Sequence, residues 1–166
     1  MNTNASYKPP DTGHRNTLAE RTLPCRPGHP PRGLGDLARR HRSALWAGKG
    51  LPTAQQWEKA ARGPGGRIYP WGNEPTAAKC NVAETGIDAT TPVFRYQSGV
   101  SPFGTFDMCG NVWEWCSTEE ERGNDRYHLE GSAFTSPFER AAPSLLNTAA
   151  ASMKDNDTGF RCTVLA

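Results

Sequence analysis

The stretch FDMCGNVWEWC, residues 106–116, gathers two carboxylates, a Gly-Asn pair, two tryptophans and two cysteines. A turn at Gly110 can fold this segment on itself and bring Asp107, Glu114 and carbonyls of the turn toward one point. Such an all-oxygen environment suits a hard cation such as calcium. In extended backbone Glu114 points away from the flanking tryptophans. The spacing leaves two interpretations open: a calcium site, or core tryptophans with carboxylates that cap turns or pair with arginines.

The length and charge of the chain indicate one domain behind a basic leader. Its 166 residues are 36% hydrophobic, and no apolar run approaches the roughly 20 residues that cross a bilayer. Residues 1–42 carry eight basic against three acidic side chains, but these are scattered among prolines with only Tyr7 as an aromatic. That pattern argues against a nucleic-acid arm. We expect a poorly ordered or degenerate leader over 1–45, a domain over 46–166, and neither a nucleic-acid nor a membrane partner.

The cysteines favour reduced thiols. Their number is odd and no CxxC pair occurs, which fits neither a complete disulfide framework nor a zinc ribbon. A cytoplasmic location is the resulting expectation. A nucleophile formed by Cys109 or Cys116 with His128 stays open from the sequence, although buried free cysteines are the commoner case. The five cysteines are Cys25, Cys80, Cys109, Cys116 and Cys162.

Local patterns predict two helices followed by short segments. Thr53 and Gln56 form a capping box that starts a helix ending at Gly63-Pro64, and a second helix is expected within residues 34–49. After Gly66, turns interrupt the chain too often for long helices. Strand-like composition occurs at residues 92–96, 111–115 and 160–165, and residues 141–157 read as a loop or a short helix.

Seven fragments in order resemble the sulfatase-modifying-factor family, the formylglycine-generating enzymes and their relatives. The resemblance covers residues 46–166 and implies an α+β, C-type-lectin-like fold with much irregular structure, held by tryptophans and bound calcium. The fragments are WAGKGLPTAQQWEKAARG (46–63), YPWGNE (69–74), CNV (80–82), TTPV (90–93), SPFGTFDMCGNVWEW (101–115), GSAF (131–134) and GFRC (159–162).

The resemblance also implies calcium ligands. In the family a calcium is held by the side chain that opens the DM.GN motif, by two carbonyls of the turn and by the glutamate of WEW. A second family site begins at an Asn-aliphatic pair and is completed from the next loop, which is shorter here. The matching residues are Asp107, Gly110, Val112 and Glu114 for the first site, and Asn81 and Val82 with Asp88 as a candidate for the second.

The catalytic motif of the family departs from its pattern. Formylglycine-generating enzymes oxidise a client cysteine with oxygen and with copper held by two cysteines, five positions apart, after a GGS turn. Here residues 130–140 read EGSAFTSPFER and contain no cysteine. Since soft sulfur ligands select Cu(I), copper is not expected. Another branch of the family displays a surface diversified by a retroelement, at the place of residues 133–157. The candidate ligand-binding residues there are Phe134, Thr135, Ser136, Phe138 and Asn147.

The sequence therefore predicts a non-catalytic domain of this family, acting as a calcium-stabilised module that binds a protein or a small ligand. Two alternatives remain. The first is a copper-dependent oxidase that generates formylglycine on sulfatase cysteines. The second is a retroelement-diversified, C-type-lectin-like variable protein whose variable surface lies in residues 133–157.

Overall fold

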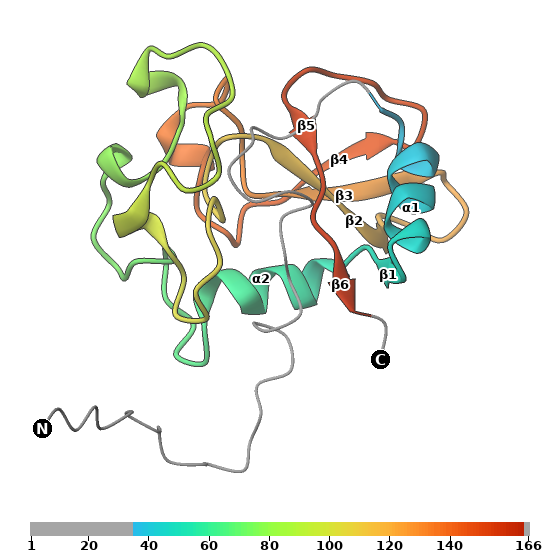
Figure 1. The fold of residues 1–166 in the computed structure, drawn as a ribbon, viewed down its shortest axis with the longest axis horizontal. Helices are drawn as coiled ribbons and strands as arrows, with labels where there is room; N and C mark the ends of the chain where they lie inside the picture. The colour runs from blue at the N-terminus through green and yellow to red at the C-terminus, as the bar shows by residue number, and fades with distance from the viewer. Residues whose placement is uncertain (1–34, 165–166) are drawn as a thin grey trace, which may run out of the picture.

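The computed structural model describes residues 35–164 and shows an α+β arrangement (Figure 1). Two helices and six short strands alternate with long irregular segments. Four three-residue 3₁₀ turns, at Ala77–Lys79, Ala83–Thr85, Gln97–Gly99 and Phe138–Arg140, lie in those segments. The elements are α1 (Leu37–Trp46), β1 (Lys49–Gly50), α2 (Ala54–Arg62), β2 (Trp113–Glu119), β3 (Arg126–Glu130), β4 (Asn147–Ala150), β5 (Thr158–Gly159) and β6 (Thr163–Val164).

Both expected helices are present, and each is started by a side-chain cap. The predicted capping box of α2 is confirmed: the Thr53 hydroxyl accepts the N–H of Gln56, and the Gln56 side chain accepts the N–H of Thr53. The α1 helix is capped by Asp36. Because α1 packs Leu37 into the core, the folded part begins before the boundary expected at residue 46. The rest of the expected leader, residues 1–34, lies outside the described residues.

The strands form a four-stranded sheet in the order β4-β3-β2-β5 and a separate two-stranded ribbon of β1 with β6. Strand β2 pairs antiparallel with β3 and parallel with β5. The expected strand at residues 111–115 is confirmed as the start of β2. Two expectations were wrong. Residues 92–96 form a turn closed by Arg95 N–H to Pro92 O at 2.9 Å, and residues 147–150 form β4 because they pair with β3.

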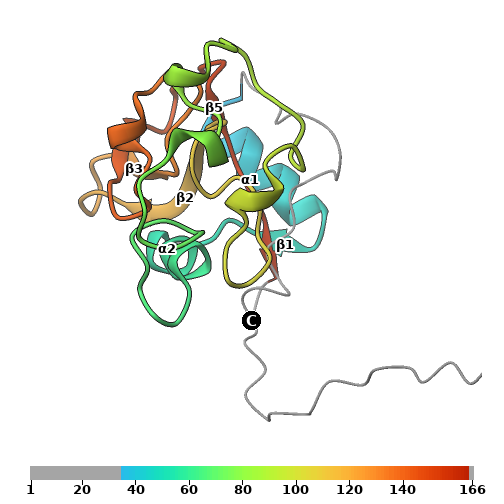
Figure 2. The same cartoon turned by 90° about the vertical axis from the view of Figure 1, so that its left-hand side faces the viewer.

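The two faces of this sheet are buried by different helices (Figures 1 and 2). On one face Trp115 and Leu129 pack with Leu37 and other residues into one apolar cluster. Against the other face lies α2, which brings in the fully buried Trp57. The irregular residues 66–105, green to yellow in Figure 1, close the end of the molecule away from α1. The segment 106–116 therefore runs through the centre of the fold.

Candidate functional site

The turn within FDMCGNVWEWC is fixed by backbone contacts to distant segments. Gly110 N–H donates to Gly131 O at 2.6 Å, and Asn111 N–H donates to Asn81 O at 2.7 Å. Gly110 has a φ of 74°, and a Cβ built on it would fall on the Asn81 carbonyl. Glycine is therefore required here both by conformation and by space. The turn brings residues of both predicted calcium sites close together.

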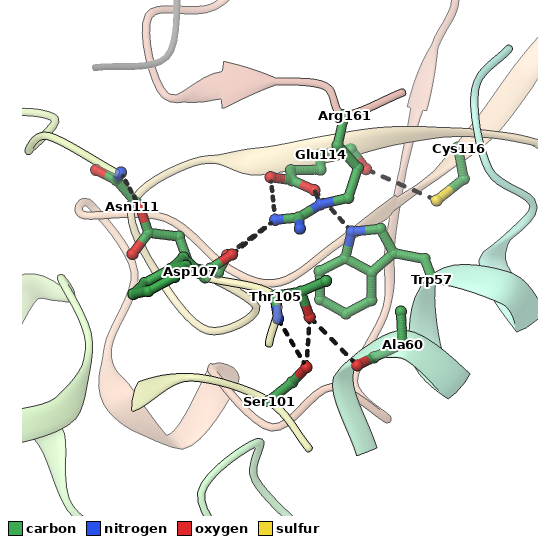
Figure 3. A network of polar contacts seen from close by, with 10 residues as sticks. Trp57, Ala60, Ser101, Thr105, Asp107, Asn111, Glu114, Cys116 and Arg161 are labelled. Carbon is green, nitrogen blue, oxygen red and sulfur yellow. Dashed lines mark hydrogen bonds and ion pairs between the residues drawn. The ribbon is translucent and has the colours of Figure 1, made fainter. Parts of the chain in front are cut away.

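Glu114 lies inside the molecule and is paired with an arginine. The residue is 6% exposed, and Arg161 donates Nη2 to its Oε1 at 2.8 Å and Nε to its Oε2. The indole N–H of Trp57 donates to the same Oε2 at 2.7 Å (Figure 3). A buried carboxylate needs such a cation because its desolvation is costly. Three elements thus meet at Glu114: α2, β2 and the segment between β5 and β6.

Arg161 is a residue of this site that sequence reasoning missed. It belongs to the GFRC motif, residues 159–162. Its Nη2 also donates to the carbonyls of Phe106 and Asp107, at 3.1 and 3.4 Å. A basic residue inside the otherwise apolar segment GFRCTV was the available signal, because such a charge is buried only with a partner.

Asp107 has weaker compensation than Glu114. Its Oδ2 accepts from Asn111 Nδ2 at 2.9 Å. Burial raises the pKa of Asp107 to about 7, although the Asn111 hydrogen bond and the Arg161 charge oppose the shift and Glu114 adds to it. The backbone at Asp107 has a φ of 51°, a conformation that Asp adopts more readily than most residues. The fold therefore half-buries a carboxyl group whose charge it does not fully balance.

The second predicted calcium site is filled by internal hydrogen bonds. The Asn81 Nδ2 donates to Asn111 Oδ1 at 3.2 Å, and Asn81 Oδ1 accepts from the Thr85 hydroxyl at 3.1 Å. The Val82 carbonyl accepts from the same hydroxyl at 2.8 Å. Asp88 is exposed, with a φ of 53°. Asn81 and Val82 are thus brought together with Thr85, whereas Asp88 takes no part in these hydrogen bonds.

The oxygen donors around Asp107 fit a hard cation such as calcium. The undercompensated carboxyl lies in the same turn as the carbonyls of Gly110 and Val112. Within residues 35–164 no group of three or more His, Cys, Asp or Glu side chains could hold a metal ion, so an ion here would depend on backbone oxygens. Both Glu114 oxygens accept hydrogen bonds from the Arg161 guanidinium, so Glu114 could hold a cation only by leaving that pair.

The candidate ligand-binding residues divide between interior and surface. Phe134 is 7% exposed, which corrects its expected place on a binding surface: the ring is core. The exposed Thr135 donates its hydroxyl to Asp157 Oδ2 at 2.6 Å and so joins two loops. Phe138 stacks on Tyr69 with ring centroids 5.3 Å apart. Ser136 is half-buried, and Asn147 is exposed at the start of β4.

Cys109 and Cys116 are not presented as nucleophiles. Their exposed fractions are 2% and 0%, and burial raises the pKa of both thiols well above the ordinary value. A buried thiol of raised pKa holds little thiolate at neutral pH. The Cys-His nucleophile left open by the sequence therefore gains no support.

Comparisons with known proteins agree with this architecture. Residues 42–166 match the family described as "Sulfatase-modifying factor enzyme 1-like domain". The inactive C-alpha-formylglycine-generating enzyme 2 of Mus musculus is 33% identical over 135 residues, covering 70% of this chain and 43% of the relative. The formylglycine-generating enzyme of Thermomonospora curvata is 37% identical over 114 residues, covering 60% and 35%. The chain spans less than half the length of these curated relatives.

Two solved structures share the fold. PvdO from Pseudomonas aeruginosa superposes with a TM-score of 0.71 at 22% identity, covering 85% of this chain and 65% of PvdO. The U1 variant of the Major Tropism Determinant gives a TM-score of 0.54 at 15% identity, covering 86% and 44%. Within residues 35–164 no helix is long and apolar enough to cross a membrane. With its C-type-lectin-like α+β fold and its match over residues 42–166, the chain belongs to the sulfatase-modifying-factor family of formylglycine-generating-enzyme-like domains.

Proposed function

We propose that this chain is a non-catalytic binding domain of its family and that it presents the surface of residues 135–157 to a protein ligand. The observation that carries the proposal is the lack of cysteine in the segment that follows the Gly131-Ser132 turn. Residues 133–140 contain no cysteine. The cysteines of the described residues are at most 2% exposed, so this part of the chain offers no thiolate pair at its surface.

The 135–157 surface has the features of a protein contact. Leu145 and Leu146 are 42% and 46% exposed and stand next to each other between the last 3₁₀ turn and β4. Arg140 is exposed and its guanidinium lies over the Trp113 ring, 5.9 Å from the centroid. Arginine is enriched in binding hot spots, and exposed apolar side chains add contact area that a partner can bury.

Calcium is part of the proposal as a stabilising ligand of the folded state. Asp107 and the carbonyls of Gly110 and Val112 would hold the ion, which would supply the positive charge that the Asp107 carboxyl lacks; Glu114 would join them only by leaving Arg161. Binding to the folded state alone raises the melting temperature with calcium concentration. The Asp107→Ala variant should lose this rise. An equal rise in the variant would place the ion elsewhere.

A binding screen tests the surface. The full chain is applied, with calcium present, to arrays of proteins and of glycans. The double variant Leu145→Asp/Leu146→Asp should abolish capture of any protein that the wild type binds. Ile68→Asp is the matched control, because Ile68 is 48% exposed and lies outside the surface. Equal capture by the double variant, or capture of glycans alone, would overturn the assignment of a protein ligand to this surface.

The competing functions have direct tests. If incubation with copper, oxygen and a cysteine-containing sulfatase peptide gave formylglycine, the chain would be an oxidase and the proposal would fail. The retroelement alternative predicts that sibling copies differ mainly within residues 133–157. The fold shared with the Major Tropism Determinant is the observation that favours this alternative.

A further inference from the structure

Two buried cysteines stand side by side beneath the 135–157 surface. Asn81 and Gly110 form a parallel bridge, and Cys80 and Cys109 each precede a member of that bridge by one residue. Segments paired in a parallel bridge run about 4.8 Å apart, and both cysteine side chains enter the same buried apolar cluster. This separation lies within the roughly 4.4–6.8 Å between Cα atoms that a disulfide spans.

The surroundings of the pair separate it from the other cysteines of residues 35–164. Cys80 and Cys109 pack in one apolar cluster with Val82 and Ala141. Cys116 belongs to the cluster under α2, and Cys162 packs on the other face of the sheet. A disulfide between Cys80 and Cys109 would therefore need little rearrangement, whereas one to either other cysteine would require the core to open.

One thiol of the pair also holds the surface segment. Cys109 Sγ–H donates to the Ala141 carbonyl at 2.8 Å. Ala141 is fully buried and directly follows the 3₁₀ turn Phe138–Arg140, whose Phe138 and Arg140 lie on the 135–157 surface. Oxidation of Cys109 removes the hydrogen that this bond requires. The buried Ala141 carbonyl then loses its hydrogen-bond donor, so the segment Phe138–Ala141 is bound less tightly to the core.

We propose that Cys80 and Cys109 form a reversible disulfide whose formation loosens the segment Phe138–Ala141. The oxidant is a small disulfide such as oxidised glutathione. One cysteine, as thiolate, attacks it and releases the first glutathione thiolate; the second cysteine displaces the second, forming the protein disulfide. Two electrons pass from the cysteines to the oxidant, and the two thiol protons end on the two released glutathiones.

Burial sets the conditions under which this exchange occurs. Cys80 and Cys109 are 1% and 2% exposed. The thiolate forms and meets the oxidant only when the cover over the pair opens. The pair therefore stays reduced during brief exposure to oxidant and responds to a sustained oxidising environment.

The first experiment maps the bond in the full wild-type chain. The protein is incubated with oxidised glutathione, its remaining thiols are alkylated under denaturing conditions, and its peptides are identified by mass spectrometry without reduction. A linked peptide joining Cys80 to Cys109, with Cys116 and Cys162 alkylated, is the expected result. Recovery of Cys80 and Cys109 as alkylated thiols, or bonding of either to another cysteine, would overturn the proposal.

The second experiment measures the hold on the segment by limited trypsin digestion. Cleavage after Arg140 should be about threefold to tenfold faster in the oxidised chain, the factor expected from losing one hydrogen bond. Cleavage after the exposed Arg122 should not change. In the reduced state Cys109→Ala should be cut faster after Arg140 than Cys109→Ser, whose hydroxyl can still donate. Equal cleavage rates at Arg140 in both redox states, or a parallel rise at Arg122, would refute the proposal that the disulfide loosens this segment alone.

Discussion

A buried glutamate next to the Glu114 ion pair predicts an unusual dependence of stability on pH. Glu130 is 3% exposed, and its Oε2 has no hydrogen-bond partner among residues 35–164. It stands opposite Glu114 in the ladder of β2 and β3. Burial, followed by the charges of Glu58 and Glu114, raises its pKa from 4.5 to about 8. The folded protein therefore keeps this carboxyl protonated at neutral pH.

The effect of Glu130 on the free energy of unfolding follows from the linkage between proton binding and folding. The folded state binds this proton more tightly than the unfolded state, so the associated stability is present below pH 4.5 and is lost as pH rises toward 8. A difference of about 3.5 pKa units corresponds to roughly 5 kcal/mol in the free energy of unfolding. Between pH 5 and pH 7 the loss from this group is roughly 2–3 kcal/mol.

The variant Glu130→Gln isolates this contribution, because its amide has a similar shape and does not ionise. Unfolding by urea, followed by tryptophan fluorescence, gives the free energy of unfolding at pH 5, 6, 7 and 8. The variant should gain roughly 2–3 kcal/mol relative to the wild type between pH 5 and pH 7. Asp107 titrates in both proteins, so its contribution cancels when their free energies of unfolding are subtracted. The exposed Glu139→Gln is the control, and a difference that stays constant with pH for Glu130→Gln would refute the reasoning.

Three further substitutions test the packing of the site by the same urea assay. Gly110→Ala should cost more than about 3 kcal/mol because its Cβ meets a backbone carbonyl, whereas Gly104→Ala, with a φ of 78° and open space around it, should cost about 1–2 kcal/mol. Equal costs would argue against the close approach. Arg161→Ala should cost about 3–5 kcal/mol by leaving a buried charge, and adding Glu114→Gln should recover part of it. No recovery would show that Arg161 acts by other contacts. Trp57→Phe should cost about 1–2 kcal/mol for the lost indole hydrogen bond, and an unchanged stability would mean that Glu114 is satisfied without it.

The elements that the sequence predicted well are those fixed by neighbours along the chain. The capping box at Thr53 and Gln56 involves residues three apart, and it set the start of α2 correctly. Residues 147–150, Asn-Thr-Ala-Ala, have little strand propensity, and they form β4 because β3 offers a partner. Residues 92–96 have strand-like side chains, but a local turn bond to the Pro92 carbonyl prevails. Pairing between distant segments carries no local signal.

The same limit applies to the carboxylates of FDMCGNVWEWC. Their spacing predicted that Asp107 and Glu114 lie together around a turn, but the partner of Glu114 is Arg161, which comes after three more strands. A carboxylate at 6% exposure requires a cation, and the sequence did not show which cation would reach it. With Glu114 paired to arginine, the charge left to balance is that of Asp107, whose raised pKa records the deficit. The calcium hypothesis therefore now depends chiefly on Asp107 and the turn carbonyls, and not equally on two carboxylates.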